Sequence, residues 1–300
     1  MIYKIILFPL LSLLSRLPSS LLYAFGDVCA FFLAHVIRYR RRLVMSNLHR
    51  AFPEKSMEER RVIAEKFYRI LGERIAESIM ALSMSKEEIL KRCCVKDLSI
   101  VEQWSKENFS IVALLGHCGA WEWAALTASI VTDYPMVVAL YSPPRNKYWD
   151  EWINKIRGRF GLKLISMRGS AFANYYRYGV SCKAIHLFLA DQSPGGLQGA
   201  VWCRFLNSNL PFLSGPARFA AAHQCKILYV EVVRLRRGYY EIRLTPIDIP
   251  VTAAQHQEIT CRYAKLLEAQ IYRLPEDWLW SHKRWKHADK APAEMKDFCG

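Results

Sequence analysis

The stretch 109-FSIVALLGHCGAWEWAAL-126 decides how the rest of the chain is interpreted. Residues 110–116 are apolar after the first, Ser110, and such a run is typical of a strand buried on both faces of a sheet. The run ends in Gly116 and His117, and residues 122–131 then read as a helix. A strand followed at once by a helix is the unit of a parallel α/β sheet, and such sheets bind ligands at the carboxyl ends of their strands. The stretch therefore predicts a histidine at the functional edge of an α/β domain.

The same alternation continues along the chain. Further strand-like runs lie at residues 136–140, 163–167, 184–190 and 226–235. Helical stretches lie between them at residues 148–160 and 216–223, and a late helix is expected within 252–277. The segment 231-EVVRLRRGYYEIRL-244 predicts a hairpin that turns near Arg236–Gly238. The fold class that follows is α/β, with a mainly parallel central sheet flanked by helices.

Residues 54–92 have the pattern of helices. Apolar residues recur there at helical spacing, and Ser56 and Ser85 stand where N-caps are expected. The resulting organisation has four parts. It places a membrane anchor with a basic flank at 1–45, a helical segment at 46–108, the catalytic α/β domain at 109–290 and a frayed tail at 291–300.

The N-terminus carries two apolar runs, residues 1–15 and 21–37, and then a cluster of arginines. The cluster comprises Arg38, Arg40, Arg41 and Arg42. A buried core helix and a cleaved signal peptide are alternatives. The positive cluster after the second run argues against a signal peptide and favours a membrane anchor whose flank faces the cytoplasm. The apolar runs leave open whether the anchor spans the membrane or lies in its surface.

Composition narrows the possible partners. The chain has 42 Lys and Arg against 27 Asp and Glu, a net charge of +15, which favours an anionic partner such as nucleic acid, anionic lipid or an acidic carrier protein. A nucleic-acid partner is disfavoured, because nucleic-acid binding would not explain the apolar N-terminal runs. The nine cysteines are scattered, except for the adjacent pair Cys93 and Cys94, and form no C-x-x-C. This pattern favours reduced thiols facing the cytosol and gives no metal site.

His117 and Glu122 form a candidate acid/base site. On one continuous helix residues five apart would point away from each other, but glycines at 116 and 119 allow a turn between them. Glu122 could then hold one imidazole nitrogen and leave the other free to act as a base. The chain contains no G-x-S-x-G, so the nucleophile is expected to be a hydroxyl of the acceptor. The competing interpretation is a histidine at a strand end beside an exposed helix glutamate.

Four segments resemble one enzyme family. His117 and Glu122 fit the H-x-x-x-x-D/E motif of glycerolipid-type acyltransferases. The segments are 45-MSNLHRAFPEKSMEER-60, 140-LYSPPRNKYWDEWINKIRGRFGLKLI-165, 189-LADQSPGG-196 and 275-PEDWLWSHKRWK-286. Together they resemble the late acyltransferases of lipid A biosynthesis, the lauroyl and myristoyl transferases of Gram-negative bacteria, over about residues 20 to 287. The last segment is the most specific single match.

This resemblance implies roles for individual residues. His117 would be the general base and Glu122 its partner, and Arg157 and Asp191 would complete the catalytic set. The implied substrate-binding residues are Arg145, Arg159, Arg168 and Gln192. The family pattern has an arginine where Ser142 stands and a second acidic residue where Ser193 stands. These two departures concern the acceptor rather than the type of reaction.

The resemblance also implies a reaction and its setting. A fatty acyl chain would pass from an acyl-acyl carrier protein, or from acyl-CoA, to a hydroxyl of a lipid A glycolipid precursor. The reaction would occur at the cytoplasmic face of the inner membrane, with no metal or cofactor. Two alternatives remain: the same chemistry on a lysophospholipid or aminolipid acceptor, and a non-catalytic protein that binds lipid at the membrane surface.

Overall fold

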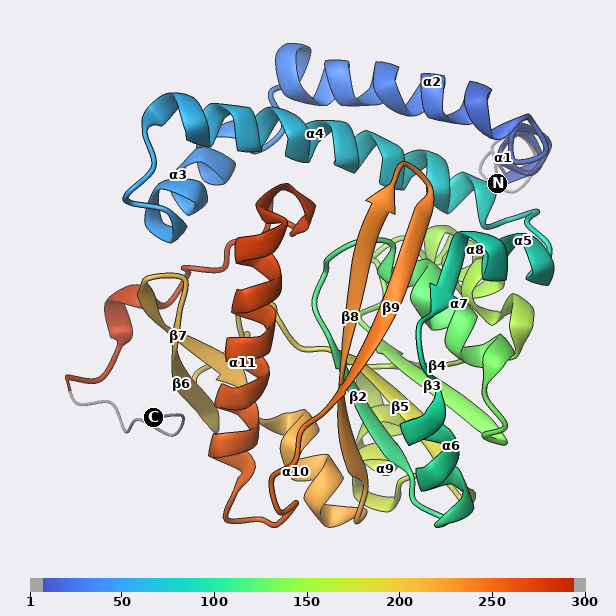
Figure 1. Ribbon diagram of the computed structural model, residues 1–300, viewed down its shortest axis with the longest axis vertical. Helices are drawn as coiled ribbons and strands as arrows, with labels where there is room; N and C mark the ends of the chain where they lie inside the picture. Colours follow the sequence, from blue (N-terminus) through green and yellow to red (C-terminus); the bar gives the residue numbers. More distant parts are fainter. Residues whose placement is uncertain (1–7, 294–300) are drawn as a thin grey trace.

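The computed structural model describes residues 8–293 and has a seven-stranded sheet at its centre (Figure 1). The strand order is β1-β9-β8-β2-β5-β3-β4, and every neighbouring pair is parallel except the β8–β9 hairpin. In chain order the strands are β1 (Cys93–Val95), β2 (Ile111–Leu115), β3 (Met136–Tyr141), β4 (Lys163–Ser166), β5 (Ala184–Leu189), β8 (Lys226–Arg236) and β9 (Tyr239–Pro246). The expected α/β class with a mainly parallel sheet is confirmed.

Strand β2 lies inside the sheet and is buried along its whole length. Ile111, Ala113 and Leu115 face one hydrophobic core, whereas Val112 and Leu114 face the other. Alternate residues of a strand point to opposite faces of a sheet, so a strand covered on both sides needs an apolar residue at every position. This requirement explains the uninterrupted apolar run in the sequence.

Helices cover both faces of the sheet. The face that includes Ile111 and Leu115 packs against α5 (Lys86–Arg92), α6 (Ser99–Lys106), α7 (Trp121–Val131) and α8 (Lys147–Arg157). The opposite face packs against α9 (Gly169–Tyr178), α10 (Gly215–Ala222) and α11 (His256–Arg273). The small hairpin β6 (Ala200–Phe205) and β7 (Ser208–Leu213) lies beside α11 on this second face (Figure 1). Short 3-10 turns follow at η3 (Gly158–Phe160), η4 (Pro275–Asp277) and η5 (Ala288–Lys290).

The N-terminal helices form a layer at one end of the molecule (Figure 1). They are α1 (Phe8–Leu14), α2 (Ser19–Phe31), the π-helical turn η2 (Phe32–Val36), α3 (Arg41–Ala51) and α4 (Met57–Met80). α4 begins with a capping box, in which Ser56 and Glu59 each accept a hydrogen bond from the other's backbone N–H. Ser85 caps α5 in the same way through the backbone N–H of Glu88. Both caps were predicted from the sequence.

Several elements differ from the sequence-based expectation. The helical segment 46–108 also contributes β1, which pairs with β9 and so belongs to the sheet. Helix α6 lies within the expected helical segment, whereas the hairpin β6–β7 and the helix α9 were not predicted. Arg204 interrupts the apolar residues of β6, and Pro211 interrupts those of β7. Of the two terminal predictions, residues 1–7 of the first apolar run and 294–300 of the frayed tail lie outside the described residues.

Candidate active site

His117 and Asp191 meet at the carboxyl edge of the sheet. Leu115 and Leu189, the last residues of the parallel neighbours β2 and β5, are paired with each other. His117 and Asp191 each follow two residues later, so the register of the two strands brings them together. The imidazole Nδ1 lies 2.6 Å from Asp191 Oδ1, and the backbone N–H of His117 donates to Asp191 Oδ2 at 3.0 Å.

This edge is a topological switch point. The chain leaves β2 for α7 on one face of the sheet, and it leaves β5 for the hairpin and α10 on the other face. Connections that diverge from adjacent parallel strands leave a crevice between them, which is where open α/β sheets bind their ligands. The histidine singled out in the sequence therefore lies at the expected position.

Asp191 is held as an anion in a buried position. Its side chain is 2% exposed, and burial alone would favour the protonated form. The facing imidazole of His117, its two hydrogen bonds and a third from Trp278 outweigh that effect and lower the pKa of Asp191 to about 2. The Trp278 indole N–H donates to Oδ2 at 2.8 Å. Asp191 can thus stabilise a positive charge on the imidazole of His117.

The C-terminal segment supports the loop that carries Asp191. His282 Nε2 accepts the backbone N–H of Ser193 at 3.0 Å, and His287 Nε2 hydrogen-bonds to the carbonyl of Pro194 at 3.1 Å. Burial is the main cause that lowers the pKa of His282 to about 4, which keeps its ring neutral and able to accept. Trp278, His282 and His287 of this segment therefore fix the position of the loop that carries Asp191.

The second ring nitrogen of His117 faces a cavity of about 460 Å³. Gln192 Nε2 lies 3.3 Å from His117 Nε2, and the ring of Trp121 meets the imidazole edge-on at 5.2 Å between centroids. Aliphatic side chains from β2, β3, β5 and α7 line much of the cavity, and its polar side chains include His117, Gln192, Glu122 and Arg157. A base next to an apolar space is suited to act on a substrate that has both a polar group and a long apolar part.

The comparison with known proteins now identifies the family. Residues 2–287 match the family described as bacterial lipid A biosynthesis acyltransferase. The chain belongs to this family. A lipid A biosynthesis palmitoleoyltransferase of Escherichia coli (strain K12) is 25% identical over 277 residues, which cover 90% of this chain and 87% of that protein. A lipid A biosynthesis myristoyltransferase of the same organism is 25% identical over 260 residues, covering 86% and 78%. A lipid A biosynthesis acyltransferase of Haemophilus influenzae is 22% identical over 280 residues, covering 90% and 83%.

Glu122 of this family member does not occupy the position expected for it. The expectation was that Glu122 would hold an imidazole nitrogen of His117. Asp191 occupies the Nδ1 side of that ring instead, and Glu122 Oε1 accepts a hydrogen bond from Arg157 at 2.6 Å. Gly119, at φ 57°, makes the expected turn before α7. The first turn of α7 then directs Glu122 toward α8, and both Glu122 and Arg157 line the cavity.

The remaining predicted residues of this acyltransferase-family chain divide into two groups. Gln192 and Arg157 line the cavity, as expected of site residues. The guanidinium of Arg159 instead donates to the carbonyls of Ala81 and Met84, just beyond the end of α4, and Arg159 is outside the cavity lining. Arg145 and Arg168 are exposed in the loops that follow β3 and β4, at the same edge of the sheet but outside the cavity lining.

No catalytic or substrate-binding role was expected for Trp278. Its indole contacts Asp191, and its backbone forms a bridge with Cys118 next to His117. The signal was present in the sequence, because the segment 275–286 was the most specific match to the family. A tryptophan in an aromatic cluster also reads as an ordinary core residue, and its indole N–H needs a partner that only the folded chain reveals.

Proposed function

We propose that this chain transfers a fatty acyl group from a thioester donor to a hydroxyl of a lipid A precursor. The observation that carries the proposal is the His117–Asp191 pair at the edge of a largely aliphatic cavity. The names of the relatives supply the acceptor class: they are lipid A biosynthesis palmitoleoyl- and myristoyltransferases.

His117 would act as the base. With Nδ1–H donating to Asp191, Nε2 carries the lone pair and can take the proton of the acceptor hydroxyl. The resulting oxygen nucleophile attacks the thioester carbonyl, a C–O bond forms and the C–S bond breaks. The proton on Nε2 then passes to the departing thiolate, so that the products are an ester and a free thiol.

Arg157 would stabilise the negative charge that develops on the carbonyl oxygen. Its guanidinium lines the cavity together with His117, and Glu122 fixes it through the 2.6 Å ion pair. Glu122 is thus proposed as a positioning residue for Arg157.

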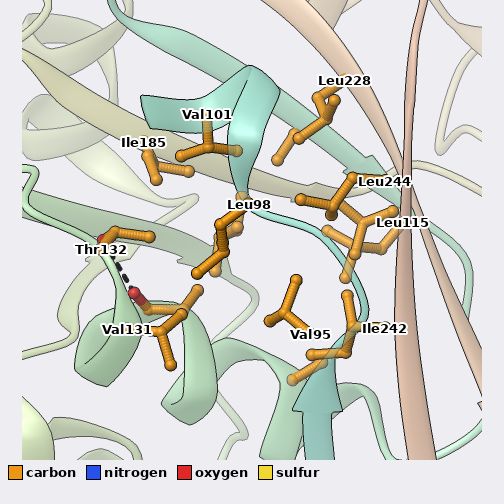
Figure 2. Close-up of a pocket in the computed structure, with 15 residues that line it drawn as sticks. Val95, Leu98, Val101, Leu115, Val131, Thr132, Ile185, Leu228, Ile242 and Leu244 are labelled. Atoms are coloured by element: carbon orange, nitrogen blue, oxygen red, sulfur yellow. Dashed lines mark hydrogen bonds between the residues drawn. The ribbon is translucent and has the colours of Figure 1, made fainter. Parts of the chain in front are cut away.

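The acyl chain would extend away from His117 along the face of the sheet that α7 covers. A second cavity, of about 40 Å³, lies there and shares Leu115 and Leu187 with the first. Its walls are aliphatic except for Thr132, whose hydroxyl donates to the carbonyl of Ala128 at 2.8 Å (Figure 2). An apolar space with its polar atoms already paired favours a hydrocarbon chain over water.

The proposed donor is an acyl-acyl carrier protein, and the proposed location is the cytoplasmic face of the inner membrane. The net charge of +15 complements an acidic carrier, and the apolar helix Ser19–Val36 is the candidate for membrane attachment.

An acceptor other than a lipid A precursor is favoured by one observation. Ser142 and Ser193, the two departures from the family pattern, both line the site cavity. Ser193 Oγ is buried and has no hydrogen-bond partner within residues 8–293. A short hydroxyl in place of a carboxylate changes what the acceptor side of the cavity can bind, so a lysophospholipid or aminolipid is the second candidate.

Membranes that contain the full chain test the proposal. They are supplied with acyl-acyl carrier protein and a tetra-acylated lipid A precursor, with His117→Ala as the control. The expected result is a product heavier by one acyl chain from the unaltered protein alone. If both preparations leave the precursor unchanged, a lipid A precursor is not the acceptor, and the same membranes are tested with lysophospholipids and aminolipids.

A further inference from the structure

Helices α1 and α2 and the turn η2 expose a long row of large apolar side chains. The exposed residues are Leu10, Leu13, Leu17, Leu21, Phe25, Val28, Phe31, Phe32, Val36 and Ile37. Leu21, Phe25, Val28 and Phe32 follow one another at intervals of four, three and four residues, which places them on one face of the helix. The surfaces of soluble monomeric proteins rarely expose so many large apolar side chains next to one another, so the row marks a binding surface.

The opposite face of α2 is docked on the body of the protein. Gly26 lies against Gly72 of α4 so closely that a Cβ on Gly26 would meet the Gly72 carbonyl oxygen at 2.7 Å. The hydroxyl of Tyr23 donates a hydrogen bond to the buried carboxylate of Glu77, and Asp27 forms a bidentate ion pair with Arg237, just beyond β8. A helix that stood across a bilayer would have to leave these polar partners and expose Tyr23 and Asp27 to hydrocarbon.

We propose that α2 lies in the plane of the membrane surface rather than crossing the membrane. Its exposed apolar side chains would insert at the boundary between the lipid headgroups and the acyl chains. The inference rests on the proposed membrane attachment and specifies its geometry. Exposed arginines at 38, 41 and 42 follow the apolar row directly. They complement anionic lipid headgroups, and a helix with one apolar face beside such a basic flank is typical of an interfacial segment.

This geometry places the site next to the lipid. Phe8 of α1 stacks on Trp152 of α8 at 6.0 Å between ring centroids and meets Trp149 edge-on at 6.1 Å. The same helix α8 ends in Arg157, which lines the cavity of His117. A lipid acceptor could therefore present its head group to His117 while its acyl chains remain in the leaflet.

The depth of α2 in a membrane distinguishes the two geometries. A fluorescent amino acid replaces Leu21 or Phe32 in separate full-length variants, which are reconstituted in vesicles of phosphatidylethanolamine and phosphatidylglycerol. Quenchers fixed at different lipid depths then locate each probe. An in-plane helix places both probes at the same shallow depth, whereas a spanning helix separates them by about 16 Å over eleven residues.

Vesicle binding tests the apolar row itself. Phe25→Glu should lower the partition coefficient of the full chain into the same vesicles by about tenfold or more. The substitution replaces an aromatic ring that would insert into the lipid by a charged carboxylate. Tyr178→Glu is the matched control, because Tyr178 is also exposed but lies on α9 at the other end of the molecule (Figure 1). Its partition should stay within about twofold of the original.

The outcomes separate the inference from the proposed function. Equal depths together with loss of binding only in Phe25→Glu support the in-plane helix. A depth difference near 16 Å overturns it but keeps membrane attachment. If the unaltered chain, Phe25→Glu and Tyr178→Glu bind vesicles equally and both probes remain in water, the in-plane helix and membrane attachment through α2 are both overturned. Acyl transfer measured in detergent micelles is independent of each result, so loss of attachment is not mistaken for loss of catalysis.

Discussion

The two ring nitrogens of His117 have different surroundings, and this difference assigns their proposed roles. Nδ1 faces a buried carboxylate whose pKa is lowered to about 2, so that carboxylate stays charged throughout the physiological range. Nε2 faces Gln192 and the cavity. A base that gains a proton on Nε2 becomes an imidazolium, and the fixed charge of Asp191 stabilises that state.

Asp191→Asn should lower turnover by about 10²-fold or more, because the neutral amide cannot stabilise the imidazolium. The measurement is the rate of acyl transfer at saturating donor and acceptor. Asp289→Asn is a matched control on an exposed aspartate of the C-terminal segment, and it should leave the rate unchanged. A rate near that of the unaltered protein for Asp191→Asn would show that Asp191 does not assist His117.

Glu122 and Arg157 should act as one unit. Each of Glu122→Gln and Arg157→Gln is expected to slow the reaction, and the double variant should be little slower than the slower single variant. A double-mutant cycle on kcat/KM measures this coupling, which we expect to exceed about tenfold. The pair Glu122→Gln and Asp191→Asn serves as the comparison, because the structure connects these residues to different partners. Independent effects of Glu122 and Arg157 would contradict a shared role.

At the scale of elements, β2, β5 and α7 enclose both cavities. α7 contributes Ala124 and Ala128 to the aliphatic cavity, and small side chains at these positions leave the space open. The depth of this space along α7 is expected to set the length of acyl chain that fits beyond Leu115 and Leu187.

Ala128→Leu should therefore shift the product toward shorter acyl chains by about two to four carbons, since the added side chain fills the far cavity. Mass spectrometry of the product, with a mixture of acyl donors, measures the shift. Ala222→Leu adds the same atoms at an exposed position of α10 and should leave chain length unchanged. An unaltered distribution in Ala128→Leu would place the acyl chain elsewhere.

Strand β5 also contains a buried histidine that should make stability depend on pH. His186 is 2% exposed and contacts the Tyr175 hydroxyl at 2.6 Å. Burial, with a smaller effect from His223, lowers its pKa from 6.5 to about 4. Between these values the unfolded chain binds a proton that the folded chain does not, so the free energy of unfolding should fall as the pH decreases from 6.5 to 4.

The contribution of His186 to this slope is at most about 1.4 kcal/mol per pH unit. Urea unfolding of the protein and of His186→Gln at pH 7 and pH 5 measures it. Glutamine keeps a polar group beside Tyr175 but does not titrate, so the variant should lose less stability on acidification. Identical pH dependence in both proteins would show that His186 takes up its proton over the same pH range in the folded and the unfolded chain.

At the scale of the whole molecule, charge and apolar surface are distributed for two kinds of partner. The net charge of +15 favours an acidic carrier, and the exposed row on α1, α2 and η2 favours lipid. Helix α8 connects the N-terminal layer to the site, because Phe8 of α1 stacks on Trp152 of α8 and Arg157 at the end of α8 lines the cavity.

Salt should weaken the use of a carrier-protein donor. Raising ionic strength to about 0.5 M shortens the screening length to a few ångströms, so the KM for acyl-acyl carrier protein should rise several-fold while kcat changes little. A short uncharged pantetheine thioester is the control donor, and its KM should respond much less. Equal responses of the two donors would argue against charge steering of the carrier.

The sequence by itself determined the alternation of strands and helices, the two serine caps, the hairpin turn and the position of His117 at a strand end. These features depend on neighbours in the chain, so periodicity and capping residues reveal them. Only the tertiary structure decided that Asp191 rather than Glu122 faces His117, that Trp278 contacts the same carboxylate and that Glu122 binds Arg157. These contacts join residues 35 to 87 positions apart. They arise from the register of β2 and β5 and from the path of the C-terminal segment, which no local pattern in the sequence encodes.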